Sequence, residues 1–360
     1  MKDLVIFIPS IESGGVEKNL FYITKFIQQK FKNIYLVSAD KPDRRISGKK
    51  IKLLIPKSNF FKNKNRLIKS FVCSYLIYKH FNNKNVLIFS LQSNFFSIFI
   101  SKLIRSKIII RLNTSPEKYV SNFFKKLFFK ILYNATDEII VNSNEFKKNL
   151  LKYFNLKSKV ILNPIKIQTV KKKKISFFKN FKGLKIICIG RLTHQKDHIT
   201  LLKALNLLKK NYNVNFKLYL IGKGYNFKLL ENFIIENRLQ KNIKLAGYKD
   251  KAFNYIKSSD LLILPSKHEG LPNTLLEAQA AGTPIISSSC KSGPREILLN
   301  GKLGELFKVG DYKSLSKKIY NHYNNQKILK QKSNLAKKYL YRFDYIKNLN
   351  KYVIIFNKYI

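Results

Sequence analysis

The sequence predicts an α/β protein with two Rossmann-like, doubly wound domains that face each other across a cleft. Short apolar runs of strand length alternate with longer segments of helical spacing, which is the pattern of a parallel sheet covered by helices. This alternation occurs in each half of the chain, and a polar, lysine-rich segment at residues 171–183 separates the halves. A length of 360 residues also suits two domains of ordinary size.

The first half contains seven candidate strands, all of them short apolar runs. They span residues 4–8, 34–38, 51–55, 86–89, 107–111, 138–141 and 160–162. Ligands of parallel sheets bind at the carboxyl ends of strands, and glycine lets the backbone approach a ligand closely. Gly14 and Gly15 follow the first strand, and Arg111 and Asn113 end the fifth. We therefore expect these four residues at the binding edge of the first domain.

The second half repeats the pattern with five candidate strands. They span residues 184–189, 216–221, 243–245, 261–264 and 284–288. From residue 312 onward the spacing is helical. We expect a first domain at residues 1–170 and a second at 171–345. Residues 346–360 are expected to form a helix that packs back on the first domain.

The charge of the chain is extreme. It has 70 basic and 20 acidic residues, a formal net charge of +50. Because the basic residues are spread over both halves without a basic arm, a lysine-rich solvated surface is favoured and we expect no nucleic-acid partner. Attraction to an anionic membrane surface is the alternative, since residues 66–81 and 121–133 combine an apolar helical face with lysines. Equally, these helices can pack on their own sheet with their lysines outward.

The sequence also indicates a compartment. No run of about 20 apolar residues marks a membrane span, because the best candidate, residues 86–110, is interrupted by polar and charged residues. The apolar run at residues 4–8 is too short for a signal peptide. Cys73, Cys188 and Cys290 have no paired spacing, which indicates reduced thiols. We expect a cytoplasmic protein at the inner face of the cell membrane.

Residues 265–284 are the centre of the candidate site. They leave the apolar strand at residues 261–264, so they begin at the carboxyl edge of a sheet. Gly270 permits a sharp turn, and Pro272 suits the first position of a helix. Gly282 ends that helix about three turns later. The stretch therefore predicts a helix start that points toward a ligand.

The chemistry of this helix start suits an anion flanked by hydroxyl groups. Backbone N–H groups at a helix start bind phosphate. Here they belong to Leu271, Asn273 and Thr274. Glu269 lies just before the helix and Glu277 one turn inside it; carboxylates do not bind anions, so we assign them to the hydroxyls of a sugar and a ribose. Arg191 and Lys196, which follow the strand at residues 184–189, are suited to neutralise a diphosphate.

Several motifs together resemble retaining glycosyltransferases of the GT4 type, which have the GT-B fold. They are Gly190-Arg191-Leu192 with Lys196-Asp197, Glu269-Gly270-Leu271-Pro272-Asn273 with Glu277-Ala278, Gly282-Thr283-Pro284, and Gly14-Gly15-Val16-Glu17. The segments at residues 90–92, 111–113 and 290–296 resemble the bacterial polysaccharide and lipid-linked oligosaccharide enzymes within that family. The resemblance covers nearly the whole chain and is strongest at residues 184–300.

The resemblance implies transfer of a sugar from a nucleotide diphosphate sugar, a UDP-hexose or UDP-N-acetylhexosamine, to a lipid-linked or polysaccharide acceptor in cell-surface glycan synthesis. Arg191 and Lys196 would hold the diphosphate, Glu277 the ribose and Glu269 the transferred sugar. The backbone of the two loops would complete the donor site, through Gly14, Gly15, Gly270, Leu271, Asn273 and Thr274. The resemblance also implies no metal ion and no other cofactor, which agrees with the absence of an Asp-x-Asp pair from the sequence.

One position departs from the family. Many relatives have a histidine near the sugar in the first domain, where this chain has Arg111 and Asn113. Either these two residues replace it, and we assign them as catalytic together with Glu269, or the chemistry differs in detail. We interpret His268 as part of the loop wall. A GT-B-fold sugar-nucleotide epimerase is the alternative, and it would work without an acceptor. A basic nucleic-acid-binding protein is a further alternative, but it leaves Glu269 and Glu277 unexplained.

Overall fold

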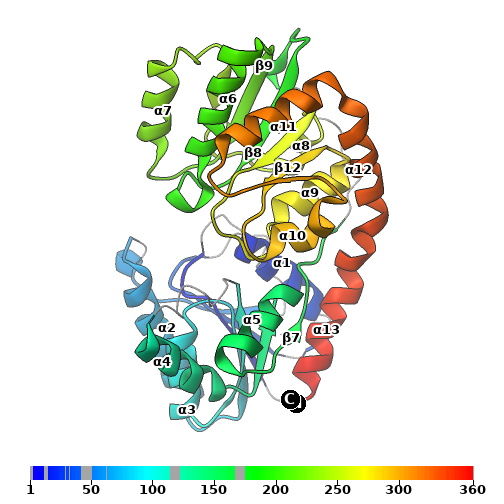
Figure 1. Cartoon of the computed structure of the whole chain (residues 1–360). Helices are drawn as coiled ribbons and strands as arrows, with labels where there is room; N and C mark the ends of the chain where they lie inside the picture. The colour runs from blue at the N-terminus through cyan, green and yellow to red at the C-terminus, as the bar shows by residue number, and fades with distance from the viewer. Residues whose placement is uncertain are drawn as a thin grey trace. The chain divides into compact units, whose positions relative to one another are not determined.

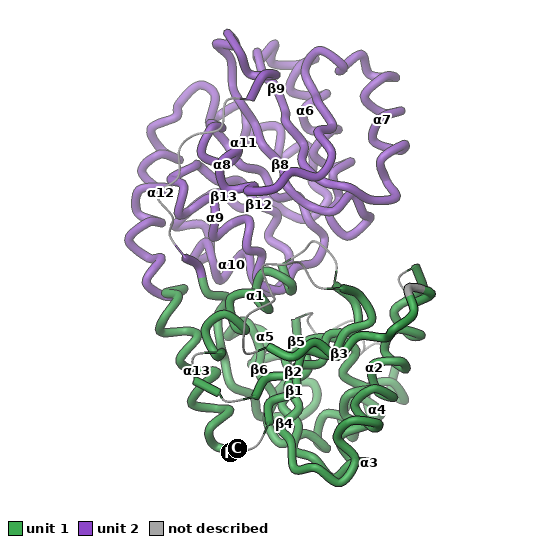
Figure 2. Tube along the Cα trace, turned by 180° about the vertical axis from the view of Figure 1, so that it is seen from behind, with its two compact units in different colours: residues 1–164, 343–360 green, residues 165–342 purple. Residues whose placement is uncertain are grey.

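A computed structural model of the chain describes residues 3–11, 15–28, 30–31, 33–41, 51–61, 63–113, 122–166 and 175–359. The chain divides into two compact units (Figures 1 and 2). Unit 1 comprises Met1–Pro164 and Phe343–Ile360, and unit 2 comprises Ile165–Arg342. The domain boundary expected at residues 170–171 lies outside the described residues.

Unit 1 contains a parallel sheet, which has seven strands among the described residues. Their order is β3-β2-β1-β4-β5-β6-β7. The strands are β1 (Asp3–Phe7), β2 (Ile34–Val37), β3 (Ile51–Leu54), β4 (Val86–Ser90), β5 (Lys107–Leu112), β6 (Glu138–Val141) and β7 (Lys159–Val160). The order reverses between β1 and β4, so the loops that follow these two strands lie at the switch point where doubly wound sheets bind ligands.

Helices cover both faces of the sheet in unit 1. They are α1 (Gly15–Ile27), α2 (Arg66–Phe81), α3 (Asn94–Leu103), α4 (Phe123–Asn134), α5 (Asn144–Phe154) and α13 (Tyr345–Asn357). Successive strand residues point to opposite faces, so Leu4 and Ile6 pack with α1 and α13 while Val5 and Phe7 pack with α2, α3 and α5. The last helix of the chain is therefore part of the core of unit 1.

Unit 2 has the same architecture. In the described part of this unit the sheet has six parallel strands in the order β10-β9-β8-β11-β12-β13. They are β8 (Leu184–Ile189), β9 (Phe216–Ile221), β10 (Ile243–Leu245), β11 (Leu261–Leu264), β12 (Ile285–Ser288) and β13 (Glu305–Phe307). The helices are α6 (His198–Tyr212), α7 (Phe227–Glu236), α8 (Ala252–Ile256), α9 (Asn273–Ala281), α10 (Gly293–Ile297), α11 (Tyr312–Asn324) and α12 (Gln326–Lys338). The switch point lies between β8 and β11.

The predicted fold class, two parallel-sheet α/β units, is confirmed, and all twelve candidate strands are present within two residues of their expected ends. Three helices, α3, α5 and α10, and one strand, β13, were not predicted. The interrupted apolar stretch at residues 86–110 folds as the succession β4, α3 and β5, and its polar residues lie at or between the ends of these elements. Within the described ranges, no helix has both the length and the apolar character needed to cross a bilayer.

Candidate functional site

Two loops at the switch point of unit 2 carry the candidate residues. Because β8 and β11 pair in parallel, the loops that leave their carboxyl ends emerge side by side. The first contains Arg191 and Lys196, and the second contains Glu269 and Gly270. Residues about 75 positions apart in the sequence are thereby placed at one edge of one sheet.

Hydrogen bonds join these loops directly. The Lys267 N–H donates to the carbonyl of Gln195 at 2.8 Å, and the Gln195 side-chain amide donates to the carbonyl of His268 at 2.8 Å. The Lys267 ammonium also lies 2.9 Å from His194 Nε2. The loops therefore hold each other through backbone groups as well as side chains, which fixes the site before any ligand binds.

Lys196 and Glu269 form an ion pair at the centre of this arrangement. Their Nζ and Oε1 atoms are 2.5 Å apart, and their side chains are only 18% and 7% exposed. The same oxygen accepts a hydrogen bond from Ser266 Oγ at 2.6 Å, and the carbonyl of Ser266 accepts one from Ser288 Oγ at 2.5 Å. The cation assigned to the diphosphate and the carboxylate assigned to the sugar are thus partners of each other in this structure.

The helix after the second loop is α9. It begins at Asn273 with Pro272 at its N-cap, one residue later than predicted. It ends at Gly282, whose φ of +71° is the left-handed conformation that favours glycine. Glu277 is 9% exposed within the helix, and Thr274 is half-buried at its start. The role of the N–H groups at this helix start remains a prediction.

Gly293 fixes the turn at Gly270. Its N–H donates to the Gly270 carbonyl at 2.6 Å, and a Cβ on Gly293 would lie 2.0 Å from that oxygen. Only glycine permits this approach. Gly293 and Ser266 were not predicted as functional residues. Gly293 occurs in the segment at residues 290–296 and Ser266 in the stretch at 265–284, but their contacts depend on the fold and no local spacing reveals them.

The neighbourhood of Lys196 also contains a buried histidine. His198 is 3% exposed at the start of α6, and its burial, together with the positive charge of Lys196, lowers its pKa to about 3. The ring is therefore neutral at physiological pH. By contrast, Arg191 and His268 are exposed.

Unit 1 places Arg111 and Asn113 at the carboxyl end of β5. Arg111 is only 1% exposed, and its guanidinium donates to Asn113 Oδ1 and Asn163 Oδ1, each at 2.6 Å. The Asn113 amide in turn donates to the carbonyl of Leu91 at 2.9 Å. Burial raises the pKa of the Tyr352 hydroxyl on α13, and the Arg111 charge opposes that rise. Arg111 thus lies under the loops as their support, and the half-buried Asn113 is the more accessible of the two residues.

The loop after β1 leads into α1, whose first residue is Gly15. Gly14 lies outside the described residues. At the neighbouring end of β4, Gln92 Nε2 donates to Glu17 Oε1 at 3.4 Å and Ser90 Oγ donates to Asn94 Oδ1 at 2.8 Å. Polar side chains therefore gather at the switch point of unit 1 as well.

Each of the two units is a doubly wound α/β domain with polar loops at its switch point, and solved structures of GT-B glycosyltransferases share this fold. HepE of Anabaena, solved in complex with UDP and glucose, has a TM-score of 0.80 over 99% of this chain and all of its own, at 16% identity. Sequence comparison agrees: the profile described as Glycosyl transferases group 1 matches residues 170–339. The chain therefore contains a group 1 glycosyltransferase domain.

Two relatives illustrate the range of this family. An N-acetylgalactosamine-N,N'-diacetylbacillosaminyl-diphospho-undecaprenol 4-alpha-N-acetylgalactosaminyltransferase of Campylobacter jejuni is 25% identical and covers 96% of this chain and 97% of its own. An uncharacterized glycosyltransferase of Methanocaldococcus jannaschii is 31% identical over 242 residues, which are 62% of this chain but only 57% of that protein.

Proposed function

We propose that this chain is a retaining, GT4-like transferase that moves a hexose or N-acetylhexosamine from a UDP-sugar to a lipid-linked or polysaccharide acceptor at the inner face of the cell membrane. One observation carries the donor half of the proposal. Two braced loops hold a cation and a carboxylate next to each other at the switch point of unit 2. A sugar diphosphate offers an anion for the cation and hydroxyl groups for the carboxylate.

The proposed binding step rearranges the Lys196–Glu269 pair. The diphosphate takes over the Lys196 ammonium, and Arg191 adds a second cation with a bidentate fork. Glu269 keeps its bond from Ser266 and accepts a hydroxyl of the transferred sugar in place of the lysine. Glu277 accepts the ribose hydroxyls, and the start of α9 faces the phosphate through Gly270, Leu271, Asn273 and Thr274. Each group then binds the part of the donor that its charge suits.

Catalysis in this scheme is electrostatic. As the bond from the sugar to the diphosphate breaks, Lys196 and Arg191 stabilise the charge that develops on the leaving phosphate without a metal ion. Retention follows the family resemblance, in which the leaving phosphate helps to deprotonate the acceptor. Asn113, held by Arg111, is the proposed contact of unit 1 with the reacting sugar. Arg111 itself is a positioning residue in this scheme, because it is buried.

The acceptor half of the proposal rests on relatives and on one surface of unit 1. The Campylobacter relative, which covers nearly the whole chain, is named for an undecaprenol-linked acceptor. A lipid carrier of that kind resides in a membrane, so an enzyme that uses one benefits from binding the bilayer. This link favours a lipid-linked saccharide over a free polysaccharide.

The surface in question, here called the α2–α3–α4 surface, combines exposed apolar side chains with lysines. Figure 1 shows the three helices together, and the Phe95 and Phe128 rings join α3 to α4 with centroids 5.9 Å apart. Its large exposed side chains are Leu67, Ile68, Phe71, Tyr75, Tyr78, Phe95, Phe99, Leu103, Phe123, Phe124, Leu127, Phe128 and Ile131. The helices carry only basic charged residues, among them Lys102, Lys125 and Lys126. We propose that this surface binds an anionic bilayer, with its aromatic rings in the interface and its lysines at the headgroups.

Titration with a panel of nucleotide sugars tests the donor site. We expect one UDP-sugar to raise the melting temperature, by an amount equivalent to about 2.7 kcal/mol at a hundredfold excess over its dissociation constant. Glu277→Ala should weaken that binding by at least about 10- to 100-fold, because a single hydrogen bond to a charged group is worth about 1.5–3 kcal/mol. Glu236→Ala, which removes an exposed carboxylate of α7, is the matched control and should bind normally.

Unchanged binding by Glu277→Ala would overturn the site assignment. Turnover should need an acceptor and continue in EDTA. Conversion of the UDP-sugar to an epimer without an acceptor would instead show the epimerase.

A further inference from the structure

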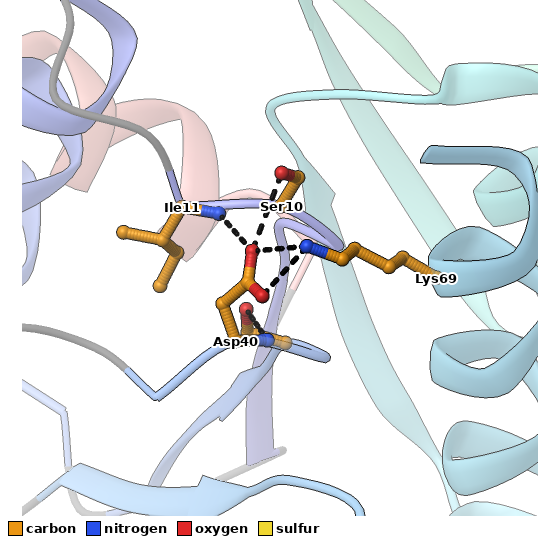
Figure 3. A network of polar contacts seen from close by, with 5 residues as sticks. Ser10, Ile11, Asp40 and Lys69 are labelled. Carbon is orange, nitrogen blue, oxygen red and sulfur yellow. Dashed lines mark hydrogen bonds and ion pairs between the residues drawn. The ribbon is translucent and has the colours of Figure 1, made fainter. Parts of the chain in front are cut away.

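Asp40 is the centre of a polar network that the donor site does not include. Its carboxylate receives the Lys69 ammonium at 2.7 and 2.9 Å, and Oδ2 also accepts the Ile11 N–H at 3.0 Å and the Ser10 hydroxyl at 3.3 Å (Figure 3). Lys69 and Ser10 are only 7% and 5% exposed. The Asp40 N–H donates to Ser38 Oγ at 3.2 Å, which fixes the carboxylate from its own backbone.

This network lies at the carboxyl edge of the sheet in unit 1. Asp40 follows β2, and Ser10 and Ile11 follow the neighbouring β1. The loop that contains Ser10 and Ile11 continues to Gly15, the first residue of α1. Lys69 comes from α2. The Asp40 carboxylate therefore connects the segments that follow β1 and β2 with helix α2. Its partner Ile11 lies four residues before Gly15, which is assigned to the donor.

We propose that Asp40 is a positioning residue for donor binding: through the Ile11 N–H it holds the backbone that follows β1, four residues before Gly15, which is assigned to the donor, while Lys69 orients the carboxylate. The donor part rests on the proposed function. The anchoring part is a property of the protein alone.

A purely structural ion pair is the competing explanation, and the chemistry separates the two. A buried ion pair contributes little net stability compared with apolar residues of the same size, so its charges alone do not explain its presence. The bond from Ile11 is different, because it needs an acceptor and not a charge. An asparagine at position 40 can accept that bond, whereas an alanine cannot.

Two double variants exploit this difference. Asp40→Asn/Lys69→Met and Asp40→Ala/Lys69→Met both remove the two charges, and neither leaves a buried ammonium unpaired. We expect the Ile11 amide to exchange its hydrogen about tenfold faster in the alanine variant than in the asparagine variant. With the UDP-sugar, the alanine variant should show a KM about tenfold higher than the asparagine variant at similar kcat.

Asp137 provides a matched control in the same unit. It too accepts a backbone N–H, from Ile108 at 2.8 Å, and a lysine, Lys107 at 2.9 Å, but it precedes β6 at the amino edge of the sheet. Asp137→Ala/Lys107→Met should lower the melting temperature without changing KM. A KM change in this variant equal to that of Asp40→Ala/Lys69→Met would overturn the proposal.

The remaining outcomes also decide. Equal Ile11 exchange in the two Asp40 variants overturns the anchor, and unequal exchange with equal KM overturns its part in donor binding. If the unmodified protein neither binds nor turns over any UDP-sugar, the proposed function fails, while exchange of Ile11 still shows whether Asp40 holds the loop.

Discussion

We predict that substitutions of Lys196 and of Glu269 change the affinity for UDP in opposite directions. In this structure each is the other's partner at 2.5 Å, and the carboxylate also accepts a hydrogen bond from Ser266. If UDP draws Lys196 away from Glu269, the glutamate competes with the diphosphate for the same ammonium. Removing the lysine should then weaken UDP binding, whereas neutralising the glutamate should leave it unchanged or strengthen it.

The magnitudes follow from the burial of the two side chains. A hydrogen bond to a charged group is worth about 1.5–3 kcal/mol, and the lower end applies because Lys196 gives up one partner to gain another. Lys196→Met should therefore raise the dissociation constant of UDP about tenfold. Glu269→Gln should lower it by about two- to threefold, yet reduce sugar transfer by at least about tenfold, since the transferred sugar loses its carboxylate.

Calorimetric titration of UDP measures these constants without turnover. The Glu305 pair in the same unit supplies the controls, because Glu305 is held by Lys318 and Lys332 between β13 and the helices α11 and α12. Lys332→Met and Glu305→Gln change the net charge by the same amounts and should leave UDP binding unchanged. If Glu269→Gln weakens UDP binding as much as Lys196→Met does, the pair does not open on binding and the proposed rearrangement is wrong.

Two further predictions concern other parts of the chain. The protein should float with phosphatidylglycerol vesicles but not with phosphatidylcholine vesicles. Phe124→Asp/Phe128→Asp should abolish flotation, whereas the control Leu151→Asp/Ile354→Asp, at exposed apolar positions outside the α2–α3–α4 surface, should not. Flotation of the Phe124→Asp/Phe128→Asp variant would contradict the assignment of this surface. His198 has a pKa of about 3 in the folded protein and about 6.5 in the unfolded chain, so between these values only the unfolded chain gains the proton. Urea unfolding should therefore show that this group costs about 1.4 kcal/mol of stability when the pH falls from 7.5 to 5.5. An equal loss of stability in His198→Gln would refute this role of His198.

The architecture could be predicted because buried parallel strands leave a clear local signal. Runs such as Leu261–Leu264 are continuously apolar, and they are bounded by glycine, proline or polar residues. The helix α3 had no such signal. Its small polar residues Ser97 and Ser101 are buried, whereas Phe95, Phe99 and Leu103 are exposed. Because polar residues lie on the buried side and apolar residues on the exposed side, the hydrophobic pattern does not show which face packs on the sheet.

The sequence was enough to name the residues of the candidate site, but it could not show which of them contact one another. The spacing of Glu269 and Glu277 on one loop and helix is local, so it is visible in the sequence. Lys196 and Glu269 are 73 residues apart along the chain, and their contact depends on the pairing of β8 with β11. The placement of Arg111 shows the same limit: its position after a strand is visible, whereas its burial under Asn113 is set by packing against distant elements.

In a chain with 70 basic and 20 acidic residues, the acidic residues are the more informative ones. A lysine at a given position has little meaning here, because the composition supplies lysines everywhere. Several carboxylates instead hold a specific donor whose loss would leave a polar group unsatisfied. Asp311 and Asp344 accept N–H groups at the starts of α11 and α13, and Asp260 accepts the Lys185 N–H. Asp40 belongs to this set by its bond from Ile11, yet it lies at the carboxyl edge of its sheet, the edge at which doubly wound sheets generally bind ligands.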